Sequence, residues 1–274
     1  MDTLTIQRQY DEVVAPHYDL DPHSVIGRSL DLAIRQIRKR RLLDNGPGHF
    51  QVLDVGVGTG SFLARLKALG GERARPFGLD LSEKMIEAAR RKVPDLVAAV
   101  DDAANLGAHF PDESFGLVCT HFITGFVPIG VLAPRIWGRL EEGGHWSLVG
   151  GTKAGFPALQ AKARSKVLGW FCGGGGLSVD DVVCNPAGRE EVVEALESNG
   201  FAVREVETFE PALHFRNFDE FMGFAYRGGW LTPFIESLGL HRAGALTRWL
   251  VNLFFFPADD HHSIEVVLAQ KVKR

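Results

Sequence analysis

Three glycines at alternating positions follow an acidic residue in the first third of the chain. The apolar stretch 51–54 ends at Asp54, and Gly56, Gly58 and Gly60 come shortly after it. Glycine lets a backbone approach a ligand closely and adopt positive φ angles. A glycine turn between a buried strand and a helix places a ligand at the carboxyl end of a sheet, beside a helix N-terminus. The pattern therefore predicts a ligand-binding turn.

The spacing of these glycines differs from that of the dinucleotide fingerprint G-x-G-x-x-G. Gly60 comes one position early, and Ser61 stands where the fingerprint has glycine. A second acidic residue, Asp80, ends the apolar stretch 77–80. A carboxylate there can accept hydrogen bonds from both hydroxyls of a ribose. The two motifs predict a ribose-containing ligand, and the spacing argues against a dinucleotide.

Hydrophobic periodicity predicts the elements that must position these residues. A helix is expected after the glycine turn, and the next should begin after Ser82 as N-cap. The pattern predicts strands at 51–54, 77–80, 97–100, 145–151, 201–207 and 263–272 and a strand running into 119–124, with helices at 29–43, 62–69, 82–92, 129–142 and 187–199.

Composition excludes several classes of protein. The 274 residues are 45% hydrophobic and 23% charged, which is typical of a globular protein. The net charge of −4 provides no basic field for nucleic acid. Cys119, Cys172 and Cys184 form no CxxC pair and are expected to be reduced thiols. We see no secretory signal, and the apolar run 249–256 is too short for a transmembrane segment, so a cytoplasmic location is expected.

Taken together, D-x-G-x-G-x-G at 54–60 and D-x-S-x-x-M at 80–85 resemble the class I S-adenosylmethionine-dependent methyltransferases. The chain is most similar to the small-molecule type that includes ubiquinone and menaquinone biosynthesis methyltransferases. A third motif, 97–106, is an apolar strand that ends in an acidic residue followed by alanine. All three motifs in order make the resemblance specific.

The resemblance implies an α/β, Rossmann-like fold with a seven-stranded sheet. The implied strand order is 3-2-1-4-5-7-6, with the last strand antiparallel. The methyltransferase core would comprise residues 50–151, 187–208 and 263–274. Residues 1–49 would form an N-terminal helical lid, and the insertions 152–186 and 209–262 would form a helical cap over the carboxyl ends of the strands.

The resemblance also implies the residues that bind S-adenosylmethionine. Asp80 would bind the ribose, Met85 would lie against the adenine, and Asp102 would accept from the adenine amino group. Tyr18 belongs to a Tyr-Asp pattern that folds over the cofactor in this family, although a surface helix with aromatic anchors is the alternative. The full set of expected cofactor-binding residues is Tyr18, Asp54, Gly56, Gly58, Thr59, Gly60, Asp80, Leu81, Met85, Asp102, Ala103 and His121.

The two insertions bear on the methyl acceptor. An insertion after the fifth strand and one before the last strand both start at the cofactor side of the sheet. The second insertion is rich in Phe, Trp and Tyr, from Phe215 to Phe256. These residues could simply pack the cap, but an apolar cap around a reaction cavity predicts a hydrophobic small-molecule acceptor. O- or C-methylation of a phenol, enol, quinone or similar compound is expected.

A hydroxyl or acidic-carbon acceptor must lose a proton, and a histidine is a suitable base. His121, at the end of the fourth strand, is the first candidate, and His262, at the start of the last strand, is the second. The rate should titrate near the pKa of the histidine that acts as base, which is about 6.5 for an unperturbed side chain. The cluster 259–262 could instead bind a metal ion, but adjacent residues on an extended chain face opposite sides, so no metal is expected.

Two other functions stay open at this point. An enzyme of this fold can keep S-adenosylmethionine as a structural ligand and catalyse a non-methyl reaction such as a cyclisation. A non-enzymatic binding protein is the third hypothesis. The sequence does not determine the acceptor atom, the natural substrate or the oligomeric state.

Overall fold

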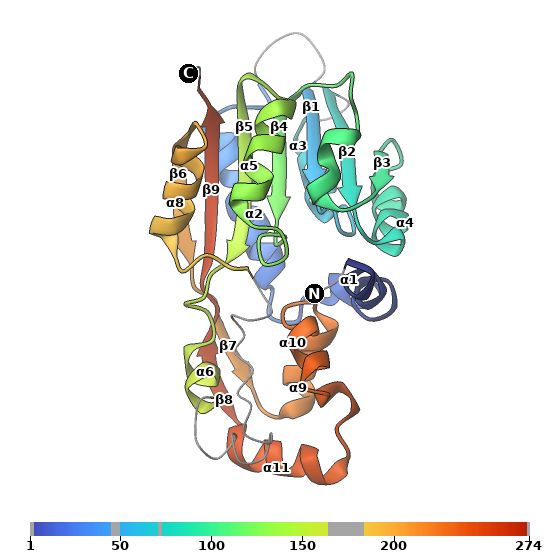
Figure 1. The fold of residues 1–274 in the computed structure, drawn as a ribbon, viewed down its shortest axis with the longest axis vertical. Helices are drawn as coiled ribbons and strands as arrows, with labels where there is room; N and C mark the ends of the chain where they lie inside the picture. The colour runs from blue at the N-terminus through green and yellow to red at the C-terminus, as the bar shows by residue number, and fades with distance from the viewer. Residues whose placement is uncertain (1–2, 45–49, 71–72, 164–183, 273–274) are drawn as a thin grey trace.

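Seven strands form one sheet, and helices lie on both of its faces (Figure 1). This computed structural model describes residues 3–44, 50–70, 73–163 and 184–272. The strand order is β3-β2-β1-β4-β5-β9-β6, and β9 is antiparallel to both of its neighbours. The predicted order and the reversed last strand are therefore confirmed, with β9 as the seventh strand of the sheet. The strands are β1 (Phe50–Val55), β2 (Ala74–Asp80), β3 (Val97–Val100), β4 (Phe115–His121), β5 (Leu140–Gly151), β6 (Phe201–Phe209) and β9 (Ile264–Lys271).

Helices cover both faces of this sheet because successive strand residues point to opposite sides. Val52 packs into the core under one set of helices, and the next residue, Leu53, packs into the core under the other. The first set is α2 (Val25–Lys39), α3 (Ser61–Gly70) and α4 (Glu83–Lys92), and the second set is α5 (Ile129–Arg139) and α8 (Arg189–Ser198), with the 3-10 helix η4 (Ala103–Ala108) at its edge.

Helices α2 and α5 differ most from the prediction, and α2 also ends at Lys39 and not at residue 43. Helix α2 begins at Val25, four residues early, because the Asp21 carboxylate accepts the backbone N–H of Gly27 at 2.8 Å. Helix α5 ends at Arg139, because Leu140 pairs with Phe115 and extends β5 towards the helix. The expected cap at the start of α4 is confirmed, since the Ser82 hydroxyl accepts from the backbone N–H of Met85.

Residues 152–163 and 210–262 form helices and short strands below the main sheet in Figure 1. This region falls within the expected insertions 152–186 and 209–262 and is called the cap. It contains a two-stranded antiparallel sheet, β7–β8, in addition to helices. Residues 258–261 form a strand at the end of this region, which the sequence analysis did not predict. Cys172 and the rest of 164–183 lie outside the described residues. The elements are α6 (Pro157–Ala163), β7 (Ala212–Phe215), α9 (Phe218–Met222), η6 (Gly223–Arg227), α10 (Thr232–Ser237), η7 (Leu240–Arg242), α11 (Ala245–Phe255) and β8 (Ala258–His261).

The N-terminal segment contacts both the core and the cap. It consists of α1 (Thr3–Gln9), η1 (Tyr10–Val14) and η2 (Tyr18–Leu20). Arg8 forms an ion pair of 2.8 Å with Glu236 of α10. The Asp11 carboxylate accepts a hydrogen bond of 2.5 Å from the Ser82 hydroxyl at the start of α4. In the described part of the chain, no helix has the length and hydropathy needed to cross a bilayer.

Candidate functional site

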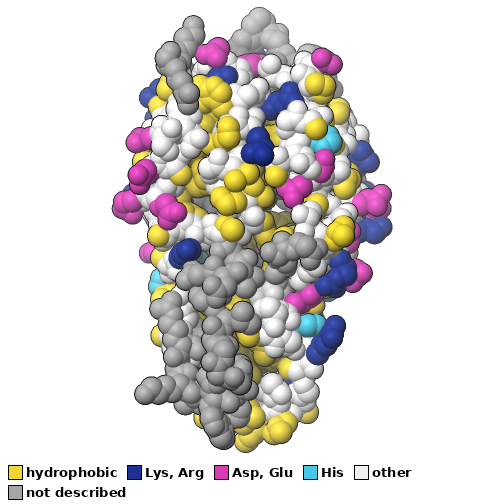
Figure 2. Space-filling view, in the orientation of Figure 1, with side chains coloured by type: hydrophobic (Ala, Val, Ile, Leu, Met, Phe, Trp, Pro, Cys, Tyr) yellow, Lys and Arg dark blue, Asp and Glu magenta, His cyan; other side chains and the backbone are white. Residues whose placement is uncertain are grey.

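A cavity of about 400 Å³ lies between the carboxyl edge of the sheet and the cap. The glycine turn, the end of β2 and the first residues of η4 line its core side. Aromatic and aliphatic residues of the cap line the other side. The space-filling view shows hydrophobic side chains around a hollow between these two parts (Figure 2). The cavity therefore joins the predicted cofactor site to the predicted acceptor site.

The glycine turn adopts backbone angles that favour glycine. Gly56, Gly58 and Gly60 have φ angles of +77°, +54° and +76°. A Cβ at Gly56 would lie 2.1 Å from Ile123, and a Cβ at Gly60 would lie 3.0 Å from the Cα of Ala89. Gly56 and Gly58 line the cavity, whereas Gly60 is needed for the close approach of α3 to α4.

Asp80 is held in place by the turn that it faces. Its carboxylate accepts the backbone N–H of Gly58 at 2.8 Å and that of Ser82 at 2.9 Å. Burial raises the pKa of Asp80 to about 6, although these backbone donors lower it. The remaining lone pairs of a carboxylate in this position can accept from ribose hydroxyls. Asp80 therefore holds the backbone of the glycine turn and also lines the cavity.

Besides Gly60, two further predicted cofactor residues, Asp54 and Thr59, do not line the cavity. Asp54 is buried beneath the turn, where burial and then the charge of Asp80 raise its pKa well above the ordinary value. Its Oδ1 atom has no hydrogen-bond partner among the described residues. The hydroxyl of Thr59 donates to Asp19 at 2.7 Å. The structure gives Thr59 a role in holding the N-terminal segment, a partner that sequence reasoning missed.

Four of the residues predicted to bind the cofactor lie near the start of α4 and of η4. Leu81, Met85, Asp102 and Ala103 all line the cavity. The Asp102 carboxylate caps η4 by accepting the backbone N–H of Ala104 at 2.8 Å. The neighbouring Asp101 is bound by His109 at 2.7 Å, which separates the roles of the two acidic residues.

Tyr18 lies over the glycine turn, with its Cε1 atom 3.7 Å from the position of a Cβ on Gly58. The next residue, Asp19, forms an ion pair of 2.7 Å with Lys92 at the end of α4. Lys92 also donates to the hydroxyls of Thr59 and Ser61. Sequence analysis did not predict this link, because Lys92 is one of several basic residues at the end of α4.

His121 lies at the end of β4 and lines the cavity. Its Nε2 atom forms a hydrogen bond of 3.1 Å with the Ser147 hydroxyl in β5, and its ring packs edge-on against Phe62. Its Nδ1 atom is buried without a partner among the described residues. The ring is therefore held by the sheet and α3, with one nitrogen left for a ligand.

His262 enters the cavity from the link between β8 and β9. Its ring stacks on Phe156 with centroids 4.5 Å apart and meets Trp230 edge-on at 5.0 Å. A Cβ on Gly151 or Gly155 would come within 3 Å of the imidazole, so these glycines make room for it. The Nδ1 atom is buried and has no partner among the described residues.

Burial lowers the pKa of both His121 and His262 to about 3. The value of about 6.5 for an unperturbed histidine therefore applies to neither residue. The reason is that both imidazoles lie in apolar surroundings, which disfavour the charged form. Both are neutral at physiological pH and can accept a hydrogen bond from a ligand.

The side chains of the cluster 259–262 point to different partners. Asp259 contacts His214 at 2.6 Å, and the Asp260 carboxylate accepts the backbone N–H of Leu159 at 2.8 Å. His262 lines the cavity. The cluster thus connects three parts of the cap instead of converging on one point.

Thr124 and Asn185 also line the cavity, and the sequence did not single them out. A Cβ at Gly150 would lie 2.3 Å from the Thr124 hydroxyl, and a Cβ at Gly125 would lie 2.8 Å from the Asn185 carbonyl oxygen. Both polar side chains occupy space that a side chain at the neighbouring glycine would fill, and each glycine is distant in sequence from its partner. Only that tertiary arrangement brings them to the site.

Comparisons with known proteins agree with this geometry. Residues 52–144 match the methyltransferase domain family. A demethylmenaquinone methyltransferase from Chlorobaculum parvum is 32% identical over 43% of this chain and 47% of that protein, so the chain spans about half the length of this relative. A trans-aconitate 2-methyltransferase from Methylobacterium radiotolerans is 28% identical over 72% of this chain and 75% of that protein.

Among solved structures, the YcgJ protein from Bacillus subtilis has the same fold. Its TM-score is 0.58 at 16% identity, over 90% of this chain and 100% of that chain. The strand order, the glycine turn and the family match agree with one another. Residues 52–144 thus match a methyltransferase domain, within a sheet whose strand order agrees with the one expected for that family.

The cavity fits S-adenosylmethionine. Asp80 presents a carboxylate for the ribose, and Gly58 leaves space where a side chain would stand. Asp102 and Met85 lie where the adenine is expected. When bound, S-adenosylmethionine would supply the electrophilic methyl group.

Replacing Gly58 by valine should abolish cofactor binding without unfolding the domain. The positive φ angle of Gly58 disfavours a β-branched residue, and the new side chain would project towards Tyr18 and the cofactor space. Calorimetry with S-adenosylhomocysteine and circular dichroism would test this. A variant that binds as tightly as the wild type would refute the assignment of Gly58, and Gly107→Val, which has no atom near its Cβ position, is the control.

Cofactor affinity should rise as the pH increases from 5 to 7. The pKa of Asp80 is about 6, and the ionised carboxylate is the form that accepts two hydroxyl bonds. In the apoprotein the same raised pKa has the opposite effect on folding. The folded state then holds the proton more tightly than the unfolded state, so this group lowers the free energy of unfolding as the pH rises from about 4 to 6. Calorimetric titration of S-adenosylhomocysteine across this range tests the first effect, and a flat dissociation constant would contradict it.

Proposed function

We propose that the protein transfers the methyl group of S-adenosylmethionine to a hydrophobic small molecule. The observation that carries the proposal is the single cavity that connects Asp80 and Asp102 to the aromatic cap. An acceptor in the cap part of this cavity would lie directly beside the cofactor's methyl group. The reaction is an in-line displacement, and alignment of acceptor, methyl carbon and sulfur supplies much of the rate.

In this proposal the cofactor is bound by the turn and by the ends of β2 and β3. Asp80 binds the ribose, Asp102 and Met85 contact the adenine, and Gly56 and Gly58 let the backbone approach. Tyr18 and the rest of the N-terminal segment act as a lid. The ion pair of Asp19 with Lys92 and that of Arg8 with Glu236 support this role, because they join the segment to the core and to the cap.

The acceptor is expected to be flat, apolar and able to lose a proton. The cap side of the cavity is lined mainly by aromatic and aliphatic side chains. Its polar groups include His262, Thr124 and Asn185, which suit one or two hydroxyl or carbonyl groups of the acceptor. We propose O- or C-methylation of a phenol, enol, quinone or similar compound. The cytoplasmic location remains a prediction.

His262 is better placed than His121 to contact the acceptor. Its ring lies between Phe156 and Trp230 in the cap part of the cavity. The Nε2 atom of His121 is already bonded to Ser147. A neutral His262 would accept the acceptor's proton as negative charge develops on the acceptor, since a neighbouring anion favours the imidazolium form. At saturating cofactor the rate should then show no inflection near pH 6.5.

A mass measurement tests the proposal. The protein is incubated with S-adenosylmethionine and a panel of lipophilic phenols, enols and quinols. We expect products in which one methyl replaces one hydrogen, with one S-adenosylhomocysteine formed per product. A product of unchanged mass without S-adenosylhomocysteine would favour a cyclisation or another non-methyl reaction. Failure to bind S-adenosylmethionine in calorimetry would favour a non-enzymatic binding protein.

A further inference from the structure

Helix α11 closes the lower end of the molecule and has two different apolar faces. None of its residues is buried. Val251 and Phe255 line the cavity from one face. Leu246, Trp249 and Leu253, at helical spacing on the other face, are 71%, 59% and 59% exposed. A single helix, α11, therefore separates this part of the cavity from the solvent.

The outer face presents more large apolar side chains than a solvated helix needs. Phe254, 51% exposed, extends the face formed by Leu246, Trp249 and Leu253. Hydrophobic side chains are visible at the lower end of the molecule (Figure 2), where Figure 1 places α11. A contiguous exposed apolar face of this kind usually marks an interaction surface.

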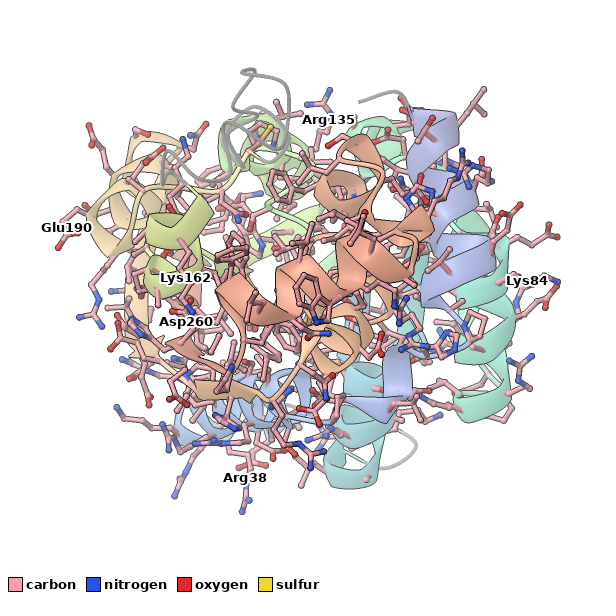
Figure 3. The ribbon with its side chains drawn as sticks, turned by 90° about the horizontal axis from the view of Figure 1, so that it is seen from below. Arg38, Lys84, Arg135, Lys162, Glu190 and Asp260 are labelled. Carbon is pink, nitrogen blue, oxygen red and sulfur yellow. The ribbon has the colours of Figure 1, made fainter. Side chains whose placement is uncertain are left out.

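The basic residues around α11 indicate which kind of partner its exposed apolar face contacts. Residues 240–256 contain Arg242 and Arg248 and no Asp or Glu, although the whole chain has a net charge of −4. Arg248 forms an ion pair with Asp219. Lys162 donates to the carbonyl of Phe255 at the C-terminal end of the helix. Seen from below, α11 crosses the centre of the molecule, and Lys162 lies at one end of it (Figure 3).

We propose that α11 lies on the surface of an anionic lipid membrane. Trp, Leu and Phe on one face of a helix, with basic residues beside them, are the side chains that insert at the boundary between lipid headgroups and acyl chains. The basic residues attract anionic lipids. The opposite face of the same helix lines the cavity, so a lipophilic acceptor could pass from the membrane past α11 to the cofactor. This delivery role rests on the proposed methyltransferase function, whereas membrane contact does not.

Vesicle flotation tests the membrane contact on the full chain. The probes are vesicles of phosphatidylcholine alone and of phosphatidylcholine with phosphatidylglycerol. We expect the wild type to float with the anionic vesicles and to lose this binding at high salt. The double variant Trp249→Glu/Leu253→Glu should bind at least about tenfold more weakly, because two inserted side chains become charged. Leu69→Glu, at a residue of α3 that is 45% exposed, is the matched control and should bind like the wild type.

Two results would overturn the proposal. The first is a wild type that does not float with anionic vesicles, or a double variant that floats equally well. The second is that light scattering shows a dimer for the wild type and a monomer for the double variant, while neither protein binds vesicles. Helix α11 would then contact a second copy of the chain. Calorimetry with S-adenosylhomocysteine on every variant reports the cofactor site independently. Failure of membrane binding is thereby distinguished from failure of the proposed function.

Discussion

Replacing His262 by alanine should lower turnover by roughly 10²–10⁴-fold, which is the usual contribution of a positioned acid or base. His262 is the histidine whose ring lies between Phe156 and Trp230 in the acceptor part of the cavity. Its neutral form, favoured by burial, is ready to accept a proton from a bound hydroxyl or acidic carbon. Cofactor affinity should stay within a few-fold of the wild type.

His262→Phe separates the role of the nitrogen from that of the ring. Phenylalanine keeps the stacking on Phe156 but removes the proton acceptor. Turnover should fall as far as in the alanine variant, with single-turnover kinetics on a lipophilic phenol or enol as the measurement. A phenylalanine variant with wild-type turnover would show that His262 only shapes the cavity. His121→Ala provides the comparison, and a larger loss there would return the base assignment to His121.

Asp80→Ala should weaken the binding of S-adenosylhomocysteine by more than tenfold and up to roughly 10⁴-fold. Each hydrogen bond to a charged group contributes about 1.5–3 kcal/mol, and the carboxylate is expected to accept two. The substitution also removes the acceptor of the Gly58 and Ser82 N–H groups, so the turn loses part of its support. Isothermal titration calorimetry is the measurement.

Two control variants test whether the loss of affinity is specific to the Asp80 carboxylate. Asp80→Asn keeps an acceptor oxygen and should bind more tightly than the alanine variant, but without the pH dependence between 5 and 7. Asp101→Ala removes a nearby carboxylate that His109 already occupies and should lose little affinity. An Asp80→Ala variant with an unchanged dissociation constant would show that the second motif does not bind the ribose.

The core of the fold was determined locally and could be predicted. Strand residues such as Val52 and Leu53 alternate between two apolar layers, and glycines with positive φ angles follow β1 and α8, at Gly56 and Gly200. Asp80 and the capping serine, Ser82, act through neighbours a few residues away or through the adjacent strand. Local periodicity and motif spacing carry such features, whereas the sheet order was predicted from the family resemblance that the motifs support.

The acceptor side was decided by tertiary structure. The pairing of β7 with β8 joins segments more than 40 residues apart, and short strands leave no clear periodic signal. His262 reaches the cavity because Gly151 and Gly155 leave space for its ring. Its pKa of about 3 depends on the aromatic residues that surround it, which no local pattern reveals.

The same distinction holds within the glycine motif. The sequence predicted that Gly56, Gly58 and Gly60 bind one ligand. In the structure, Gly60 instead allows α3 and α4 to approach each other, because the Cα of Ala89 lies 3.0 Å from the Cβ position of Gly60. Thr59 likewise bonds to Asp19, 40 residues earlier in the chain. The residue types and their spacing determined that a ligand turn exists. Which of its members face the ligand depended on the helices and the N-terminal segment that pack around it.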